Sequence, residues 1–196
     1  MSQASMSQTL QGWRVAFLVA PEGIEQVELT EPWQAVEQAG GTPELISVQS
    51  GTVQAFRHLD KADTFPVDRV VTEANVDDYI GLALPGGVAN PDLLRTVPDA
   101  VQFAADFAAR GKPIAAICHA PWLLVEADLV RGRRVTSWPS LRTDLVNAGA
   151  DWVDQQVVVD RDLVTSRKPD DLPAFNEQLV ATFSAAAAAQ RAQTGA

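Results

Sequence analysis

The chain has 196 residues, of which 46% are hydrophobic and 20% charged, and this composition excludes fibrous and disordered proteins and fits one globular domain. A formal net charge of −10 gives no electrostatic basis for binding nucleic acid, so we expect no nucleic acid as partner. No segment approaches the ~20 apolar residues of a membrane helix and no signal-peptide pattern is present, so we expect no membrane partner and a cytoplasmic protein.

The first half of the chain alternates short apolar runs with an amphipathic segment. The runs end at Pro or Gly, as in strands that are covered on both faces, and the amphipathic stripe ends at a Gly pair that suits a helix terminus. In chain order the predicted elements are a strand over 13–20, a helix over 26–39, a strand over 43–48, a hairpin or irregular excursion over 51–68 and a strand over 79–84.

The second half continues the alternation, with helices closed by Gly and strands rich in Val, Ile and Ala. In chain order the predicted elements are a helix over 97–110, a strand over 112–117, a helix over 120–130, a strand over 134–136, a helix over 140–148, strands over 157–159 and 163–166, and a helix that begins near 170.

This alternation predicts a flavodoxin-like, doubly wound α/β fold: a three-layer sandwich around a mostly parallel sheet. We expect a disordered tail over residues 1–11, a single domain over 12–185 and an Ala-rich tail over 186–196. Loops that follow the carboxyl ends of the strands are where open α/β sheets bind ligands.

Cys118 stands at the end of a predicted strand, directly before His119 and a predicted helix. This layout is typical of a nucleophile elbow, in which a tight turn raises the side chain above the sheet. The start of a helix favours the thiolate, and its backbone N–H groups can face an oxyanion. An isolated cysteine is more often a buried apolar residue, but the adjacent histidine and the nearby Gly86-Gly87 pair favour an active site.

Five motifs stand in order along most of the chain: 84–87 (LPGG), 116–120 (AICHA), 131–137 (RGRRVTS), 144–149 (DLVNAG) and 164–175 (VTSRKPDDLPAF). In this set the chain resembles the PfpI group of intracellular proteases and protein deglycases or glyoxalases, within the class I glutamine amidotransferase-like superfamily. The resemblance implies that Cys118 is the nucleophile and His119 its partner. It also implies that an acidic residue from a neighbouring subunit completes a triad, and Asp92 occupies that place.

The resemblance further implies a carboxylate on the first helix that contacts the nucleophile. Glu25 and Glu28 both match positions of this kind, and their spacing of three would place them on one helical face. A protonated carboxyl there could donate to the thiolate or shuttle protons to substrate, whereas an ionised one would oppose the thiolate. The alternative is a solvated acidic face at a helix start.

The same resemblance places an oxyanion or substrate-binding site at Gly86, Gly87 and the backbone of His119, with Trp138 where the family has a tyrosine. For Gly86 and Gly87 the alternative is a simple tight turn. His58 is expected on the surface. Two histidines and one cysteine are too few for a structural zinc site, so we expect no metal, and nothing in the sequence implies a cofactor.

The resemblance thus implies a cysteine-dependent enzyme of stress response that acts on electrophilic carbonyls, either as a peptidase on peptides or as a glyoxalase or deglycase on a small carbonyl. It also implies a homodimer or hexamer that shares the site across an interface. The alternative is a non-catalytic stress protein that senses oxidants through Cys118, which lacks a resolving cysteine. A glutaminase is disfavoured because the chain has no late His-x-Glu pair.

Overall fold

Seven strands form the central sheet of the computed structural model, which describes residues 8–194. Their order across the sheet is β11-β12-β8-β7-β1-β3-β6, and only β11 runs antiparallel to its neighbour. Their bounds are β1 (Arg14–Val19), β3 (Thr42–Ser47), β6 (Arg69–Val70), β7 (Gly81–Leu84), β8 (Ile114–Ile117), β11 (Val157–Asp160) and β12 (Leu163–Ser166). The central strands are buried on both faces, which explains their continuous apolar sequences.

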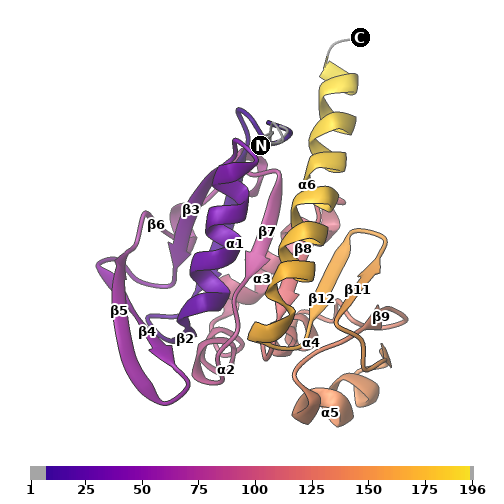
Figure 1. Ribbon diagram of the computed structural model, residues 1–196. Helices are drawn as coiled ribbons and strands as arrows, with labels where there is room; N and C mark the ends of the chain where they lie inside the picture. Colours follow the sequence, from indigo (N-terminus) through magenta and orange to yellow (C-terminus); the bar gives the residue numbers. More distant parts are fainter. Residues whose placement is uncertain (1–7, 195–196) are drawn as a thin grey trace, which may run out of the picture.

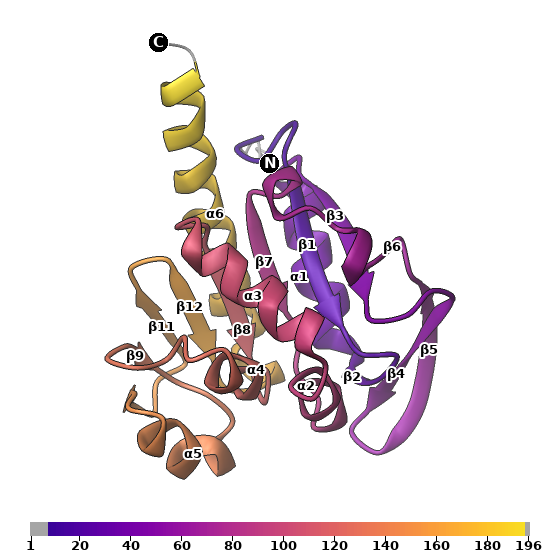
Figure 2. The same cartoon turned by 180° about the vertical axis from the view of Figure 1, so that it is seen from behind.

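Helices cover both faces of the sheet. In Figure 1, α1 (Gln26–Gln38) and α6 (Leu172–Thr194) lie in front of it. Figure 2 shows the opposite face, which is covered by α2 (Ala89–Leu94), α3 (Pro98–Ala109) and α4 (Pro121–Glu126). An apolar core lies on each side of the sheet. The predicted three-layer, flavodoxin-like α/β sandwich is therefore confirmed.

Two smaller sheets extend from the sandwich. The predicted excursion over 51–68 is a hairpin of β4 (Thr52–Arg57) and β5 (Asp60–Pro66), and β2 (Glu22–Glu25) adds to β4 in parallel. A second pair is formed by β9 (Arg134–Val135) and β10 (Asp151–Trp152), beside α5 (Arg142–Asn147). Figure 1 shows the hairpin reaching down past the start of α1. The sequence patterns predicted neither the strands β2 and β10 nor the helix α2.

The ends of the folded chain differ from the sequence-based boundaries. Leu10 is fully buried and its backbone N–H donates to Ala39, so ordered packing begins before residue 12. Residues 1–7 of the expected N-terminal tail lie outside the described residues. At the other end α6 continues to Thr194 and buries Ala187, because its alanines are strong helix formers, so the expected boundary at 185 falls inside a helix.

The central parallel strands bring their following loops to one edge of the sheet. The segments after β1, β7, β8 and β12 therefore converge there, and they contain Glu22, Gly87, Cys118 and Pro169. Along residues 8–194, no helix is long and apolar enough to cross a membrane.

Candidate active site

Cys118 occupies the turn between β8 and α4 with a left-handed backbone, φ 64°. Such a conformation is strained for a residue with a Cβ and is held here by two hydrogen bonds. The Cys118 N–H donates to Ser166 O at 3.0 Å, and the Cys118 carbonyl accepts from Trp138 N–H at 2.9 Å. The geometry is that of a nucleophile elbow, and the thiol enters a cavity at the carboxyl edge of the sheet.

His119 stands beside the thiol. Its Nδ1 lies 3.1 Å from Cys118 Sγ, and the residue is only 6% exposed. The imidazole stacks on Trp138 with ring centres 5.6 Å apart and meets Trp122 edge-on at 5.3 Å. Burial lowers the pKa of His119 to about 4, so the ring is neutral at pH 7 and can accept a proton from the thiol.

Glu28 lies beside Cys118 at the start of α1 and is fully buried. Neither carboxyl oxygen makes a hydrogen bond of normal geometry with a described residue. Burial raises its pKa to about 8; the Cys118 thiol and the Gly86 and Gly87 amides oppose the shift, and Glu25 adds to it. Glu28 is therefore mostly protonated at neutral pH, and a pKa near the working pH suits a group that gives and takes protons.

The pKa of the Cys118 thiol is raised, chiefly because burial penalises the thiolate, and an ionised Glu28 raises it further. The backbone N–H groups of Gly87 and His119 oppose this shift. The His119 N–H at the helix start thus favours the thiolate, as expected, but burial outweighs it and the pKa of the thiol is raised overall. The helix α4 has only six residues, and its terminus does not offset the loss of hydration.

The spacing of three predicted that Glu25 and Glu28 share a helical face, and this prediction is wrong. Glu25 is the last residue of β2, before α1 begins, and its carboxylate faces the β4–β5 hairpin. Glu25 Oε2 accepts a hydrogen bond from the backbone N–H of His58 at 2.9 Å, and the His58 ring nitrogen Nδ1 lies 4.0 Å away. The two glutamates thus have separate places: Glu28 beside the sulfur and Glu25 beneath the hairpin tip.

Gly86 and Gly87 form a closely packed loop between Cys118 and the start of α1. A Cβ on Gly86 would collide with the Glu28 carboxyl, the Cys118 side chain and the Ile117 carbonyl oxygen. Gly87 has φ 84°, and a Cβ there would strike the backbone of Gly23. Close approach therefore requires glycine at both positions, and it leaves the Gly87 N–H facing the sulfur.

Asn90, at the start of α2, fixes this loop. Its side chain is fully buried, accepts from Ala20 N–H at 2.7 Å and donates to the carbonyl oxygens of Pro85 and Gly86 at 2.8 and 3.0 Å. One amide thus ties the end of β1 to the loop after β7. No local sequence pattern identifies Asn90, because its partners include a residue 70 positions away.

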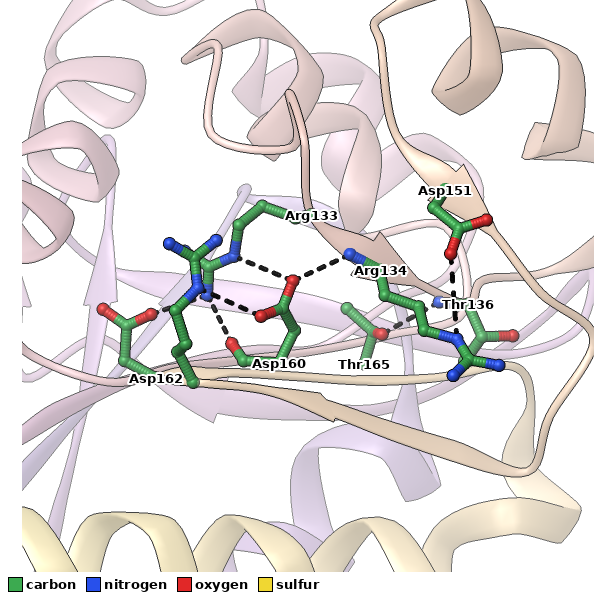
Figure 3. Close-up of polar contacts among 8 residues, drawn as sticks. Arg133, Arg134, Thr136, Asp151, Asp160, Asp162 and Thr165 are labelled. Carbon is green, nitrogen blue, oxygen red and sulfur yellow. Dashed lines mark hydrogen bonds and ion pairs between the residues drawn. The ribbon is translucent and has the colours of Figure 1, made fainter.

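Trp138 is carried by the segment that follows β9. Figure 3 shows how that segment is anchored: Arg133 binds Asp162 at 2.6 Å, the Arg134 N–H donates to Asp160 at 2.7 Å, and the Thr136 N–H donates to Thr165 at 2.9 Å. These contacts hold residues 133–136 against β11 and β12. The Trp138 ring is thereby fixed over His119 at the cavity wall.

The cavity in front of Cys118 has a volume of about 380 Å³. Its lining comes from six parts of the chain: the segment around β2 and the start of α1, the hairpin tip, the loop after β7, the elbow, and the segments after β9 and β12. The lining residues include Glu22, Glu25, Glu28, Phe56, His58, Leu59, Gly87, Val88, Cys118, His119, Trp138 and Pro169. His58 lies on the surface, as expected, with its side chain 89% exposed, and it also lines this cavity.

Asp92 lies on the exposed side of α2 and does not line the cavity of its own chain. Among the described residues, no carboxylate oxygen lies within 4 Å of a His119 ring nitrogen. A carboxylate partner for His119 would therefore have to come from a second copy. Residues 8–194 contain no group of three or more His, Cys, Asp or Glu side chains that could hold a metal ion.

Comparison with known proteins agrees with this architecture. Residues 13–182 match the DJ-1/PfpI family. The provisionally named cysteine protease YraA of Bacillus subtilis is 39% identical over 84% of this chain and 95% of its own. Protein/nucleic acid deglycase 2 of Escherichia coli is 39% identical over 88% of this chain and 98% of its own.

A solved structure shows the same fold. A two-domain protein from Anabaena variabilis, with DJ-1/ThiJ/PfpI-like and ferritin-like domains, superposes with a TM-score of 0.82 and 32% identity over 86% of this chain and 47% of its own. The family match covers most of the chain and includes the elbow, the glycine loop and both glutamates. The chain therefore belongs to the DJ-1/PfpI family.

Proposed function

We propose that this protein is a cofactor-independent enzyme of stress response that converts α-oxoaldehydes, or their adducts on proteins, into hydroxy acids through Cys118. The observation that carries the proposal is the protonated, buried Glu28 beside a neutral thiol and a neutral His119. Such a set can add a thiol to an aldehyde and then move protons between adjacent carbons. The relative named as a deglycase supports this chemistry.

The first step is addition. The Cys118 sulfur bonds to the aldehyde carbon, His119 takes the thiol proton, and Glu28 gives its proton to the aldehyde oxygen. The product is a hemithioacetal, with Glu28 ionised and His119 protonated. In this proposal the N–H groups of Gly87 and His119, which face the sulfur, polarise the aldehyde oxygen.

The second step is isomerisation. Ionised Glu28 removes the proton from the former aldehyde carbon, and His119 protonates the neighbouring ketone oxygen, which gives an enediol. Glu28 then protonates the second carbon and recovers a proton from the oxygen of the first. The result is a thioester of Cys118, and water hydrolyses it to the hydroxy acid with release of the thiol. The sequence is redox-neutral overall and needs only water.

A peptidase activity is a second candidate, since one relative is named as a cysteine protease. It would use Cys118 on an acyl carbon and His119 as the base, with Asp92 of a neighbouring subunit orienting the imidazole. Oxidant sensing is less well supported than either activity, because a thiol whose pKa is raised by burial offers little thiolate to an oxidant.

The test is turnover of methylglyoxal by the wild type and by Cys118→Ala, with lactate measured by NMR and a fluorogenic peptide assayed in parallel. We expect lactate from the wild type and a loss of kcat/KM on the order of 10³ or more in the variant. Cleavage of the peptide alone, dependent on Cys118, would instead establish the peptidase. No turnover in either assay would overturn both proposals.

A further inference from the structure

The tip of the β4–β5 hairpin lies against the cavity that holds Cys118. Arg57 pairs with Asp60, so the turn consists of His58 and Leu59. Both residues line the cavity, although 94% of Leu59 and 89% of the His58 side chain are exposed. At 94% exposure Leu59 contributes little to the folded core, and its place in the cavity lining leaves its side chain free to contact a bound molecule.

The turn is held in a conformation that its sequence does not favour. His58 has φ 57°, a left-handed backbone at the first central position of a two-residue hairpin loop, where glycine is preferred. Glu25 stabilises it by accepting the His58 N–H, and β2 pairs with β4 directly alongside. A strained turn that is anchored over an active-site cavity indicates that the position of the tip serves the site.

The cavity has two chemical parts. Cys118, His119 and Glu28 form its reacting end, and Phe56, Leu59, Val88, Trp138 and Pro169 supply apolar walls. A three-carbon dicarbonyl fills only a small part of about 380 Å³. A larger substituent on the carbonyl would reach the walls that the hairpin provides.

Charge limits which substituent fits. The described lining residues include the carboxyl groups of Glu22, Glu25 and Glu28 but no Lys or Arg. Arg57 and Lys61 flank the hairpin tip without lining the cavity. An anionic group would therefore enter without a cation to pair with it, whereas an apolar or cationic group meets a compatible surface.

We propose that the hairpin tip, His58 and Leu59 held by Glu25, is an outer subsite that binds an apolar, non-anionic substituent of the carbonyl substrate. This inference rests on the proposed function, since the substituent belongs to the molecule that Cys118 attacks. It makes Leu59 a specificity-determining residue and Glu25 a positioning residue. The enzyme then selects larger, uncharged α-oxoaldehydes over carboxylated ones.

The experiment compares kcat/KM for methylglyoxal, phenylglyoxal and 4-carboxyphenylglyoxal, the last two being a pair that differs in charge. We expect the wild type to favour phenylglyoxal over its carboxylated analogue by about tenfold or more, from the uncompensated charge. Leu59→Ser should lower the ratio of kcat/KM for phenylglyoxal to kcat/KM for methylglyoxal by about fivefold, as expected for lost contact with one leucine. Val146→Ser, at an exposed apolar residue on α5 away from the cavity, is the matched control.

The subsite would be overturned if the ratio of kcat/KM for phenylglyoxal to kcat/KM for methylglyoxal were equal in Leu59→Ser and Val146→Ser. It would also be overturned if the wild type favoured the carboxylated substrate, even if methylglyoxal is turned over. If no dicarbonyl is turned over, the proposed function fails, and the subsite is judged by binding. Acetophenone, an unreactive ketone, is then titrated into Cys118→Ala with and without Leu59→Ser and followed by NMR. A weaker affinity in the double variant supports the subsite, and an unchanged affinity overturns it.

Discussion

Buried Glu28 lowers the stability of the folded protein, and the proposed mechanism uses its proton. Its carboxyl group is fully buried, and its pKa of about 8 lies far above the ordinary value of 4.5 because burial penalises the charge. Buried polar groups without hydrogen bonds destabilise a protein and are retained mainly where function needs them. At the scale of the single residue, Glu28 is therefore the side chain that most clearly separates an active site from a structural core.

The pKa of Glu28 predicts how stability depends on pH. The folded state binds a proton that the unfolded state has lost between pH 4.5 and about 8, so stability falls as pH rises through this window. His119, whose pKa is lowered to about 4 from 6.5, acts with the opposite sign, but only between those two values. Between pH 6.5 and 8, stability therefore depends on pH through Glu28 and not through His119.

We therefore expect the free energy of unfolding of the wild type to fall by about 1–2 kcal/mol from pH 6.5 to 8, and Glu28→Gln to remove most of this decrease. Urea unfolding at several pH values measures the effect. Glu31→Gln, at an exposed position on the same helix, is the matched control and should keep the wild-type slope. Parallel slopes for the wild type and Glu28→Gln would show that Glu28 is ionised when folded.

At the scale of elements, the site depends on loops that side chains tie together. Asn90 links the end of β1 to the loop after β7, and the contacts of residues 133–136 fix the segment that carries Trp138. The hairpin is attached in the same manner, by Glu25 to His58. The sheet places the loops at one edge, and these few hydrogen bonds set their positions.

Asn90→Ala should therefore disturb the site as well as stability. It removes three hydrogen bonds, leaves the buried Ala20 N–H without its acceptor, and should cost about 2–4 kcal/mol. We also expect a lower kcat for methylglyoxal under conditions where the variant is fully folded, because the Gly87 N–H loses its position. Asn147→Ala, at an exposed asparagine, is the control. Full activity in folded Asn90→Ala would contradict this role.

The sequence predicts the elements of this fold better than their contacts. Apolar runs of four to six residues between Gly and Pro identify the buried strands, and the placement of Cys118 identifies the elbow. The helix α2 escaped prediction because it has six residues and contains Pro91. The contact of Asn90 with Ala20 joins positions 70 residues apart, and that of Glu25 with His58 joins positions 33 apart, and no local pattern encodes such distances.

At the scale of the whole molecule, one chain holds the nucleophile but no carboxylate within reach of the His119 ring among its described residues. Asp92 is exposed on α2, in the same loop region as Val88, which is 58% exposed at the cavity mouth. A second copy that brings Asp92 to this face would supply the missing carboxylate, as the family resemblance implies. The shared site is a proposal about assembly and is tested by mixing subunits.

Cys118→Ala and Asp92→Ala should each have low peptidase activity alone, and unfolding and refolding them together should recover part of that activity. Recovery arises because a mixed interface joins an intact Cys118 to an intact Asp92 from the other subunit. Light scattering should show at least a dimer at micromolar concentration. A monomer, or a mixture no more active than its separate components, would rule out a site shared through Asp92.

The most direct test of the proposed mechanism is the pH dependence of kcat/KM for methylglyoxal in the wild type and in Glu28→Gln. The mechanism starts from neutral His119 and protonated Glu28, so the wild-type profile should be bell-shaped, with an acidic limit set by protonation of His119 and a basic limit near pH 8 set by Glu28. Glu28→Gln should lose activity at all pH values, along with the limit near pH 8. A wild-type rate that keeps rising through pH 9, as for an enzyme limited only by its thiolate, would contradict the assignment of Glu28 as the proton donor.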